Sequence, residues 1–170
     1  MRVRRNLNST VAITQNSSES SAIKEGLSLL NISSMIKNDD VVVITPNFVN
    51  KGGVGYGDVV GPESFRTILK IIKSCSPKRV IVATASAQQD IEKVMKDIGF
   101  MDVIQDEKVE FINLNNGPFV KIRLNHSSPE YTSLNKLYEE MTFLISFTQL
   151  KIHEEATMSA AIKNIALGWP

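Results

Sequence analysis

The run Val41-Val42-Val43-Ile44 limits the fold most strongly, because it sets four β-branched residues side by side. β-branched side chains favour strands, and a strand without polar alternation has both faces covered by other elements. Asn38-Asp39-Asp40 before the run is typical of a turn, and Pro46 ends the strand. The sequence therefore predicts a buried central strand in a parallel sheet.

Strands and helices alternate along the rest of the chain. Short apolar runs predict strands, and apolar residues at i, i+3, i+4 and i+7 predict helices. This alternation at βαβ spacing predicts a three-layer α/β/α sandwich with a mostly parallel, Rossmann-like sheet. The expected strands are residues 10–14, 41–44, 79–84, 109–114, 119–124 and 143–147, and the expected helices are residues 22–30, 62–76, 91–98, 128–141 and 156–167.

The two strands expected at 109–114 and 119–124 are separated by Asn115-Asn116-Gly117-Pro118, which favours a turn. Either they pair as a hairpin, or only the first of them joins the main sheet. The sequence leaves both arrangements open.

Composition narrows the class of protein. A chain of 170 residues with 42% hydrophobic residues suits one domain, and we expect a frayed end at 1–9 and a single α/β domain over 10–170. Because 19 basic residues balance 18 acidic ones and aromatic residues are only 6%, we expect neither nucleic acid nor a membrane surface as a partner. The single cysteine, Cys75, excludes an internal disulfide and cysteine-rich metal sites. With no apolar run approaching ~20 residues, we expect a cytoplasmic location.

Ligands of open α/β sheets bind beyond the carboxyl ends of the strands. In the predicted fold this rule selects residues 45–61, 85–89 and 148–155, which converge if their strands are neighbours. The first segment holds five glycines and is either a ligand-binding lid or a plain flexible loop, without the Gly-Lys-Ser/Thr of a P-loop. In the second, Ser86 is either the N-cap of the next helix or a hydroxyl presented to a ligand.

The third segment carries the densest group of polar residues. Lys151 and His153 follow a strand at spacing i, i+2, so both side chains point the same way where the backbone is extended. Lysine is a point charge for a carboxylate or phosphate, and histidine can exchange a proton or bind a metal near neutral pH. Glu154 and Glu155 are expected to begin the last helix, where acids favour its dipole. The other histidine, His126, lies in an expected loop, so we expect no metal site.

The last expected helix has an apolar stripe that we expect to face inward, formed by Met158, Ala161, Ile162 and Ile165. Lys163 and Asn164 lie off this stripe. They belong either to a solvated face or to the candidate site.

Four motifs make residues 11–170 resemble a family called domain of unknown function 362. These motifs are VVVITPNFVN at 41–50, PESFRTILKIIK at 62–73, Lys-Ile-His at 151–153, and Ala-Ile-Lys-Asn-Ile at 161–165 followed by Gly168. The resemblance implies that Asn47 pins backbone groups or a ligand, that Lys151 and Lys163 hold an anion, and that His153 transfers a proton or coordinates a metal. It also selects Pro46 and Asn164, and Asn50 in the first motif is a further candidate ligand contact.

The chain departs from the family pattern at two places. Thr45 stands where the family has a lysine, and Thr84-Ala85-Ser86-Ala87 stands where it has an acidic or glycine-rich turn, so an inherited anion site is expected to be weaker. Some members carry a ferredoxin-like segment with cysteine clusters, which this sequence lacks, and no cofactor follows from the resemblance. Because members usually continue past the position of Gly168, we expect the N-terminal portion of the domain or a shortened relative.

Two functions fit these observations. The first is a ligand-binding α/β domain with a phosphate or carboxylate site at the carboxyl edge of its sheet. If it is an enzyme, its catalytic candidates are Lys151 and His153, and the expected ligand contacts are Asn47, Asn50, Ser86, Lys163 and Asn164. The second is a non-catalytic half-domain or interaction module that a second copy, a partner or a missing C-terminal lobe completes. Trp169 is then an expected docking residue.

Overall fold

The structure, a computed structural model, describes residues 9–47, 59–86, 90–153 and 157–169. For His153, it describes the backbone but not the side chain. Most of the glycine-rich loop, with Asn50, therefore lies outside the described residues, as do Glu154 and Glu155 and all but Ser9 of the expected frayed end. Across these four stretches, no helix is both long and apolar enough to cross a membrane.

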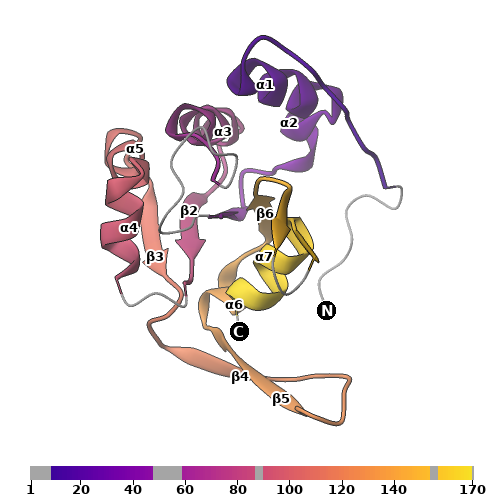
Figure 1. The fold of residues 1–170 in the computed structure, drawn as a ribbon, viewed down its shortest axis with the longest axis vertical. Coiled ribbons are helices and arrows are strands. Elements are labelled where there is room, and N and C mark those ends of the chain that lie inside the picture. Colours follow the sequence, from indigo (N-terminus) through magenta and orange to yellow (C-terminus); the bar gives the residue numbers. More distant parts are fainter. Residues whose placement is uncertain (1–8, 48–58, 87–89, 154–156, 170) are drawn as a thin grey trace.

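Four parallel strands form the central sheet in the order β3-β2-β1-β6 (Figure 1). Strand β1 (Val41–Pro46) lies between β2 (Arg79–Thr84) and β6 (Phe143–Phe147), and β3 (Glu110–Asn113) pairs with the far side of β2. All six residues of β1 are buried. The prediction of a central parallel strand, made from four β-branched residues, is confirmed.

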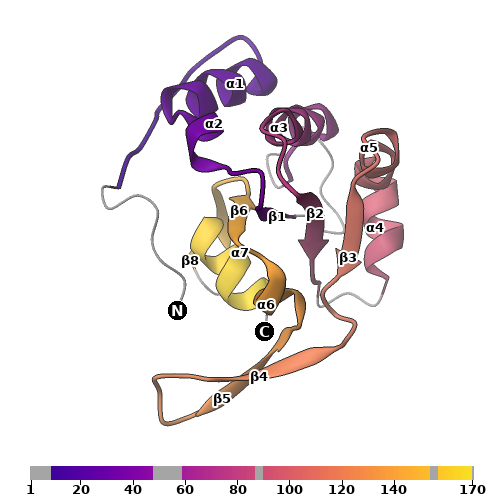
Figure 2. The same ribbon diagram turned by 180° about the vertical axis from the view of Figure 1, so that it is seen from behind.

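Helices cover both faces of this sheet, as the three-layer prediction requires. One face is covered by α3 (Pro62–Ser74), α4 (Ile91–Asp97) and α5 (Phe100–Asp106). Helix α1 (Glu19–Leu29) packs against α3 and leads into the short α2 (Ile32–Met35). The opposite face is covered by α6 (Leu137–Glu140) and α7 (Ala161–Gly168), as Figures 1 and 2 show from the two sides.

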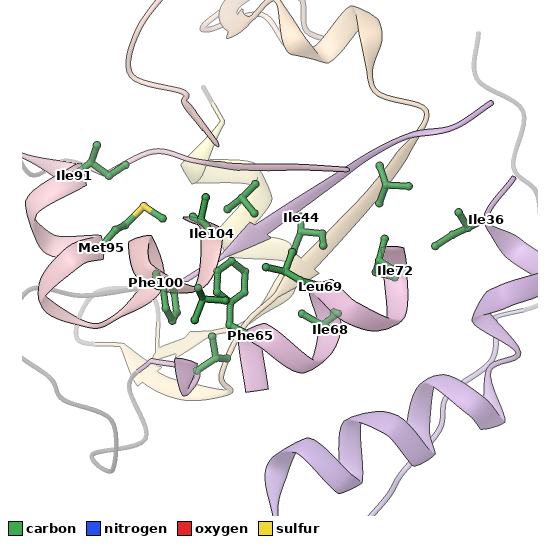
Figure 3. Close-up of a cluster of buried hydrophobic side chains, with 14 residues drawn as sticks. Ile36, Ile44, Phe65, Ile68, Leu69, Ile72, Ile91, Met95, Phe100 and Ile104 are labelled. Carbon is green, nitrogen blue, oxygen red and sulfur yellow. The ribbon is translucent and has the colours of Figure 1, made fainter. Parts of the chain in front are cut away.

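The alternation of side chains along the strands divides the core into two clusters. Val42 and Ile44 of β1 join the cluster between the sheet and α3, α4 and α5, which Figure 3 shows. There the rings of Phe65 and Phe100 lie 4.6 Å apart, between their centroids. Val41 and Val43 join the second cluster, beneath α6 and α7. Each fully buried aliphatic or aromatic side chain contributes about 1.5–3 kcal/mol, so a strand that supplies both clusters holds the three layers together.

Two hairpins lie outside the main sheet. Strand β4 (Phe119–Arg123) pairs antiparallel with β5 (Tyr131–Asn135), and this hairpin extends away from the sheet in Figure 1. Of the two arrangements left open by the sequence, the second is therefore right: only the run that becomes β3 joins the sheet. A shorter hairpin joins β7 (Lys151–His153) to β8 (Thr157–Ser159).

The strand expected at residues 10–14 is wrong. This segment has no regular secondary structure, and its apolar side chains Val11 and Ile13 are 81% and 91% exposed. The hydroxyl of Thr14 donates to the carbonyl of Ala22, so the segment lies along α1. A short apolar run becomes a strand only where another strand can pair with it, and the neighbouring element here is a helix.

Two helices were placed too broadly. The helix expected at 128–141 is strand β5 followed by the one-turn α6, because residues 131–135 pair with β4. Its apolar residues Leu134, Leu137, Tyr138 and Met141 nevertheless all contact the second core cluster. The helix expected at 156–167 begins only at Ala161, since residues 157–159 form β8.

The region after β2 also differs from its prediction. Asp90, rather than Ser86, is the N-cap of α4, and its side chain accepts a hydrogen bond from the backbone of Lys93 at 2.9 Å. Gly99 follows the end of α4 and has a φ of 81°, the left-handed conformation that glycine adopts most readily at a helix end. It also begins α5, a helix that the sequence did not predict.

Candidate functional site

The connections of the sheet change sides between β1 and β6. From β1 to β2 and from β2 to β3 the chain crosses the face covered by α3, α4 and α5, and from β3 to β6 it returns across the face of α6. In open α/β sheets the crevice beyond the carboxyl ends at such a switch point is the usual ligand position. The topology therefore directs attention to the segments that follow β1 and β6.

A pocket of about 210 Å³ lies at this edge. Four of its lining residues are Asn47, Lys151, Lys163 and Asn164, which the sequence singled out from three separate segments. The remaining described residues that line it are Pro46, Thr84, Ala85, Ser159, Leu167 and Gly168. The carboxyl ends of β1 and β2, the β7–β8 hairpin and α7 thus meet around one cavity.

The two charged residues among the described lining of the pocket are basic. Lys151 reaches it from β7 and Lys163 from α7, and none of the described lining residues is acidic. Both side chains are partly exposed, so they keep contact with solvent while facing the cavity. Two ammonium groups at one small cavity favour an anion there, since each supplies a point charge with rotatable donors.

Asn47 connects β1 with the segment that follows β6. The side-chain oxygen of Asn47 accepts a hydrogen bond from the backbone N–H of Gln149 at 3.0 Å. The backbone N–H of Asn47 donates to the carbonyl of Phe147 at 3.1 Å. Lys151 follows two residues after Gln149. Of the two roles expected for Asn47, the pinning of backbone groups is therefore the one seen, and it positions the strand that carries Lys151.

Asn164 connects α7 with the ends of the two central strands. Its amide nitrogen donates to the carbonyl of Thr45 at 2.9 Å and lies 3.2 Å from the hydroxyl of Ser146. That hydroxyl in turn donates to the carbonyl of Ala161 at 3.0 Å. These contacts fix α7 across the carboxyl ends of β1 and β6, and they hold the adjacent Lys163 at the pocket.

The inward face of α7 differs from the predicted one. Lys163 and Asn164 face the pocket, whereas Ala161 and Ile162 are exposed, the latter at 85%. Met158 lies in β8 and is exposed, so of the four residues expected to face inward only Ile165 contacts the core. The polar contacts of Asn164 with the strand ends outweigh the apolar stripe, because an unpaired buried carbonyl is costly.

The other predicted site residues lie apart from the pocket or outside the described residues. Ser86 exchanges two hydrogen bonds with Asn115, at 3.3 and 2.6 Å, which tie the end of β2 to the end of β3. It is not one of the described residues that line the pocket, although its neighbour Ala85 is. Asn50 and the side chain of His153 lie outside the described residues; the backbone of His153 pairs with Thr157 in the β7–β8 hairpin.

The pocket also contains residues that the sequence did not single out. Thr84 ends β2, and the rule of strand ends could have found it, because it selected the segment that begins at the next residue, Ala85. Ser159 lies in an unexpected strand, and Leu167 and Gly168 form the last turn of α7. Gly168 belongs to the fourth family motif, but no sequence signal marked Ser159 or Leu167, since their place depends on how α7 lies across the sheet.

The family model described as "Domain of unknown function (DUF362)" matches residues 42–170. The chain belongs to this family. Comparisons with curated proteins and with solved structures gave no match. The DUF362 match includes β1, the β7–β8 hairpin and α7, and so every described residue that lines the pocket.

In this DUF362 chain, Thr45 has a structural role. Its side chain is 1% exposed, and its hydroxyl accepts a hydrogen bond from the indole N–H of Trp169 at 3.2 Å. Trp169 is itself only 4% exposed, so the expectation that it forms a docking surface is wrong. The threonine at this position lies beneath the residue that follows α7 and is not among the described residues of the pocket wall.

A second cavity lies at the tip of the β4–β5 hairpin of the DUF362 chain. It is lined by Arg123, Glu130 and the turn between them, with His126 in that turn. Arg123 and Glu130 form an ion pair at 3.1 Å, and the ring nitrogen Nδ1 of His126 accepts a hydrogen bond from the backbone of Ser128. Because these polar groups serve the turn itself, this cavity is a weaker candidate. No group of three or more metal-ligating side chains occurs in the described part of the chain.

Proposed function

We propose that this DUF362 chain binds a small anion, a phosphate or a carboxylate, in the pocket beyond β1 and β6. One observation carries the proposal: Lys151 and Lys163, from two different elements, line the same cavity of about 210 Å³, and its described lining contains no acid. An anion in this cavity would interact favourably with both lysine side chains, because each carries a positive charge.

The proposed roles divide into two kinds. Lys151 and Lys163 contact the anion, while Asn47 and Asn164 hold the elements that carry these lysines. Asn50 and Ser86 stay predicted ligand contacts, and His153 stays the predicted residue for proton transfer. Binding alone accounts for the arrangement of the lysines, so catalysis is a further step that requires a substrate to be found. The proposed location is the cytoplasm, which fractionation of cells expressing the protein would test.

The natural test uses Trp169, which is the chain's single tryptophan and follows the pocket residue Gly168. The purified protein is titrated with inorganic phosphate, organic phosphates and carboxylates, and indole fluorescence and the midpoint of thermal unfolding are recorded. A ligand at a hundred times its dissociation constant stabilises the fold by ~2.7 kcal/mol, which shifts the midpoint measurably.

Three lysine variants make this test specific. Lys151→Ala and Lys163→Ala should each abolish the ligand-induced shift while changing the stability of the unliganded protein by no more than ~0.5 kcal/mol. Lys96→Ala, on an exposed position of α4, is the matched control and should bind like the wild type. A shift that survives both pocket variants, or the absence of a shift with every anion, would refute the proposal.

An interaction module is the second candidate function, and the outer edge of β6 supports it. Among the described strands, β6 pairs only with β1. Since Phe147 accepts a hydrogen bond from Asn47, the alternation of the strand directs the backbone groups of Leu144 and Ser146 to the unpaired side. The strand has no charged residue or proline, the features that usually protect such edges.

In this alternative, the β6 strands of two copies pair antiparallel and continue the sheet across a two-fold axis. Sedimentation velocity over a wide range of protein concentration should then show a dimer. A monomer at every concentration would contradict the alternative and leave the anion site unaffected.

A further inference from the structure

The wall of the pocket contains both charged and apolar residues. Lys151 and Lys163 supply the charge, with the hydroxyl of Ser159 beside them. The apolar part is formed by Pro46 and Ala85 at the strand ends and by Leu167 in the last turn of α7. An inorganic ion would use only the first part, so a ligand that fits the whole cavity has a carbon body as well as a charged group.

Three other polar side chains of the wall already have backbone partners. The carboxamide oxygen of Asn47 accepts from Gln149, and the carboxamide nitrogen of Asn164 donates to Thr45. The buried hydroxyl of Thr84 donates to the carbonyl of Pro46 at 3.3 Å. Recognition of several polar groups on a ligand would require these bonds to break, whereas a single anionic head group leaves them intact.

The cavity volume indicates how much of a ligand the described residues can enclose. Pockets for drug-sized molecules are roughly 300–1,000 Å³, and this one is about 210 Å³. A nucleotide would exceed this volume. A carboxylate or phosphate that carries a short carbon chain would fill it.

We infer that the ligand is a short-chain organic acid or organic phosphate, with its anionic head at Lys151 and Lys163 and its chain against Pro46, Ala85 and Leu167. This inference rests on the proposed function and adds the ligand's class. The last turn of α7 then helps to set the chain length that the pocket accepts, because Leu167 and Gly168 line the cavity there.

Gly168 offers a direct way to change the size of the pocket. A Cβ atom placed at this position meets no other atom within 4 Å, and Gly168 does not have a positive φ. Gly168→Leu should therefore fold and extend a side chain at the cavity. Gly26→Leu, inside α1 and remote from the pocket in sequence and fold, controls for the loss of a helical glycine.

The experiment is isothermal titration calorimetry with inorganic phosphate, with straight-chain carboxylates and alkyl phosphates of increasing length, and with adenosine monophosphate. Affinity should rise about two- to fourfold per added methylene, as expected for burial of a CH₂ group, and then fall once the chain exceeds the cavity. The carboxylate and phosphate series distinguish the two head groups, and adenosine monophosphate should bind more weakly than the best short-chain ligand.

Gly168→Leu should weaken the best short-chain ligand by about tenfold or more through overfilling, while binding of inorganic phosphate changes little. If phosphate binds in a lysine-dependent manner but chain length and Gly168→Leu have no effect, the inference fails and the anion site stands. Tighter binding of adenosine monophosphate than of any short-chain ligand also overturns the inference. If no anion binds at all, both the inference and the proposed function fail.

Discussion

The hydrogen bond between Trp169 and Thr45 gives the sharpest test of how α7 is held on the sheet. Thr45→Val keeps the shape of the side chain and removes the acceptor of the indole N–H. Both side chains are almost completely buried, so no solvent replaces the lost partner. Leaving a buried donor unpaired costs about 1–3 kcal/mol, and the better burial of valine offsets part of this. We expect a net loss of about 1–2 kcal/mol in the free energy of unfolding.

A double-mutant cycle separates the hydrogen bond from packing. In the Trp169→Phe background no indole N–H remains, so the hydrogen bond is already absent. Thr45→Val then removes an acceptor that no longer has a donor. That second step should be almost neutral, because removing both partners of a buried hydrogen bond leaves no group unsatisfied. The coupling energy between the two positions should therefore be about 1–2 kcal/mol.

Urea denaturation followed by circular dichroism measures all four proteins, including those without tryptophan. With an m-value of about 2 kcal/mol/M, a loss of about 1.5 kcal/mol lowers the midpoint by about 0.75 M urea. If Thr45→Val costs as much in the Trp169→Phe background as in the wild type, the hydrogen bond contributes nothing. Packing of α7 would then be the whole reason for its position.

Three further predictions concern the remainder of the fold. Gly99→Ala should lower the free energy of unfolding by about 1–2 kcal/mol in urea denaturation, since φ is 81° at Gly99. As the control, Gly26→Ala within α1 should be neutral or stabilising by up to about 1 kcal/mol. Equal effects of the two substitutions would contradict this prediction. Glu107→Gln should cost about 1–2 kcal/mol, because this mostly buried carboxylate accepts from basic side chains of α3, and the exposed Glu139→Gln is the control, with an effect within ~0.5 kcal/mol. Burial raises the pKa of the Cys75 thiol, so the unfolded chain loses this proton first as the pH rises. The thiol's contribution to the free energy of unfolding is therefore present below the unfolded pKa of about 8.5 and is lost above it. Cys75→Ser should flatten this alkaline decrease in stability, measured by urea denaturation at a series of pH values.

Much of the sheet could be predicted from the sequence because its strands carry their signal locally. The β-branched run that became β1 is fully buried, and the apolar runs that became β2 and β6 are at least partly buried. The same local apolar signal led to the wrong prediction of a strand at residues 10–14, where no strand lies beside the run. A strand needs a partner, and the presence of a partner depends on the fold as a whole.

The position of the candidate site could be predicted, but the orientation of its parts could not. The rule of strand ends placed Asn47 and Lys151 at one edge, and both line the pocket. The inward face of α7 was predicted wrongly for three of its four residues because an apolar stripe was given more weight than a single asparagine. The bond of Asn164 to the end of β1 joins residues 119 positions apart, which no local pattern reports.

Similar reasoning applies to helix starts. Ser86 and Asp90 are both good N-cap residues, and the sequence alone does not choose between them. In the structure, Asp90 caps α4 while Ser86 is held by Asn115, which follows a different strand. The choice was made by the contact between the ends of β2 and β3.

The long sequence separation of the contacts that build the pocket has a consequence for folding kinetics. Asn164 and Trp169 bond to Thr45, which lies 119 and 124 residues earlier in the sequence. The cavity is therefore complete only when the last helix has docked on strands from the first half of the chain. Contacts of this kind form late, because the intervening loop must be ordered before they contribute. A ligand of this pocket would then leave the folding rate unchanged and slow unfolding. An occupied site would therefore be detected as a longer lifetime of the folded state and not as faster refolding.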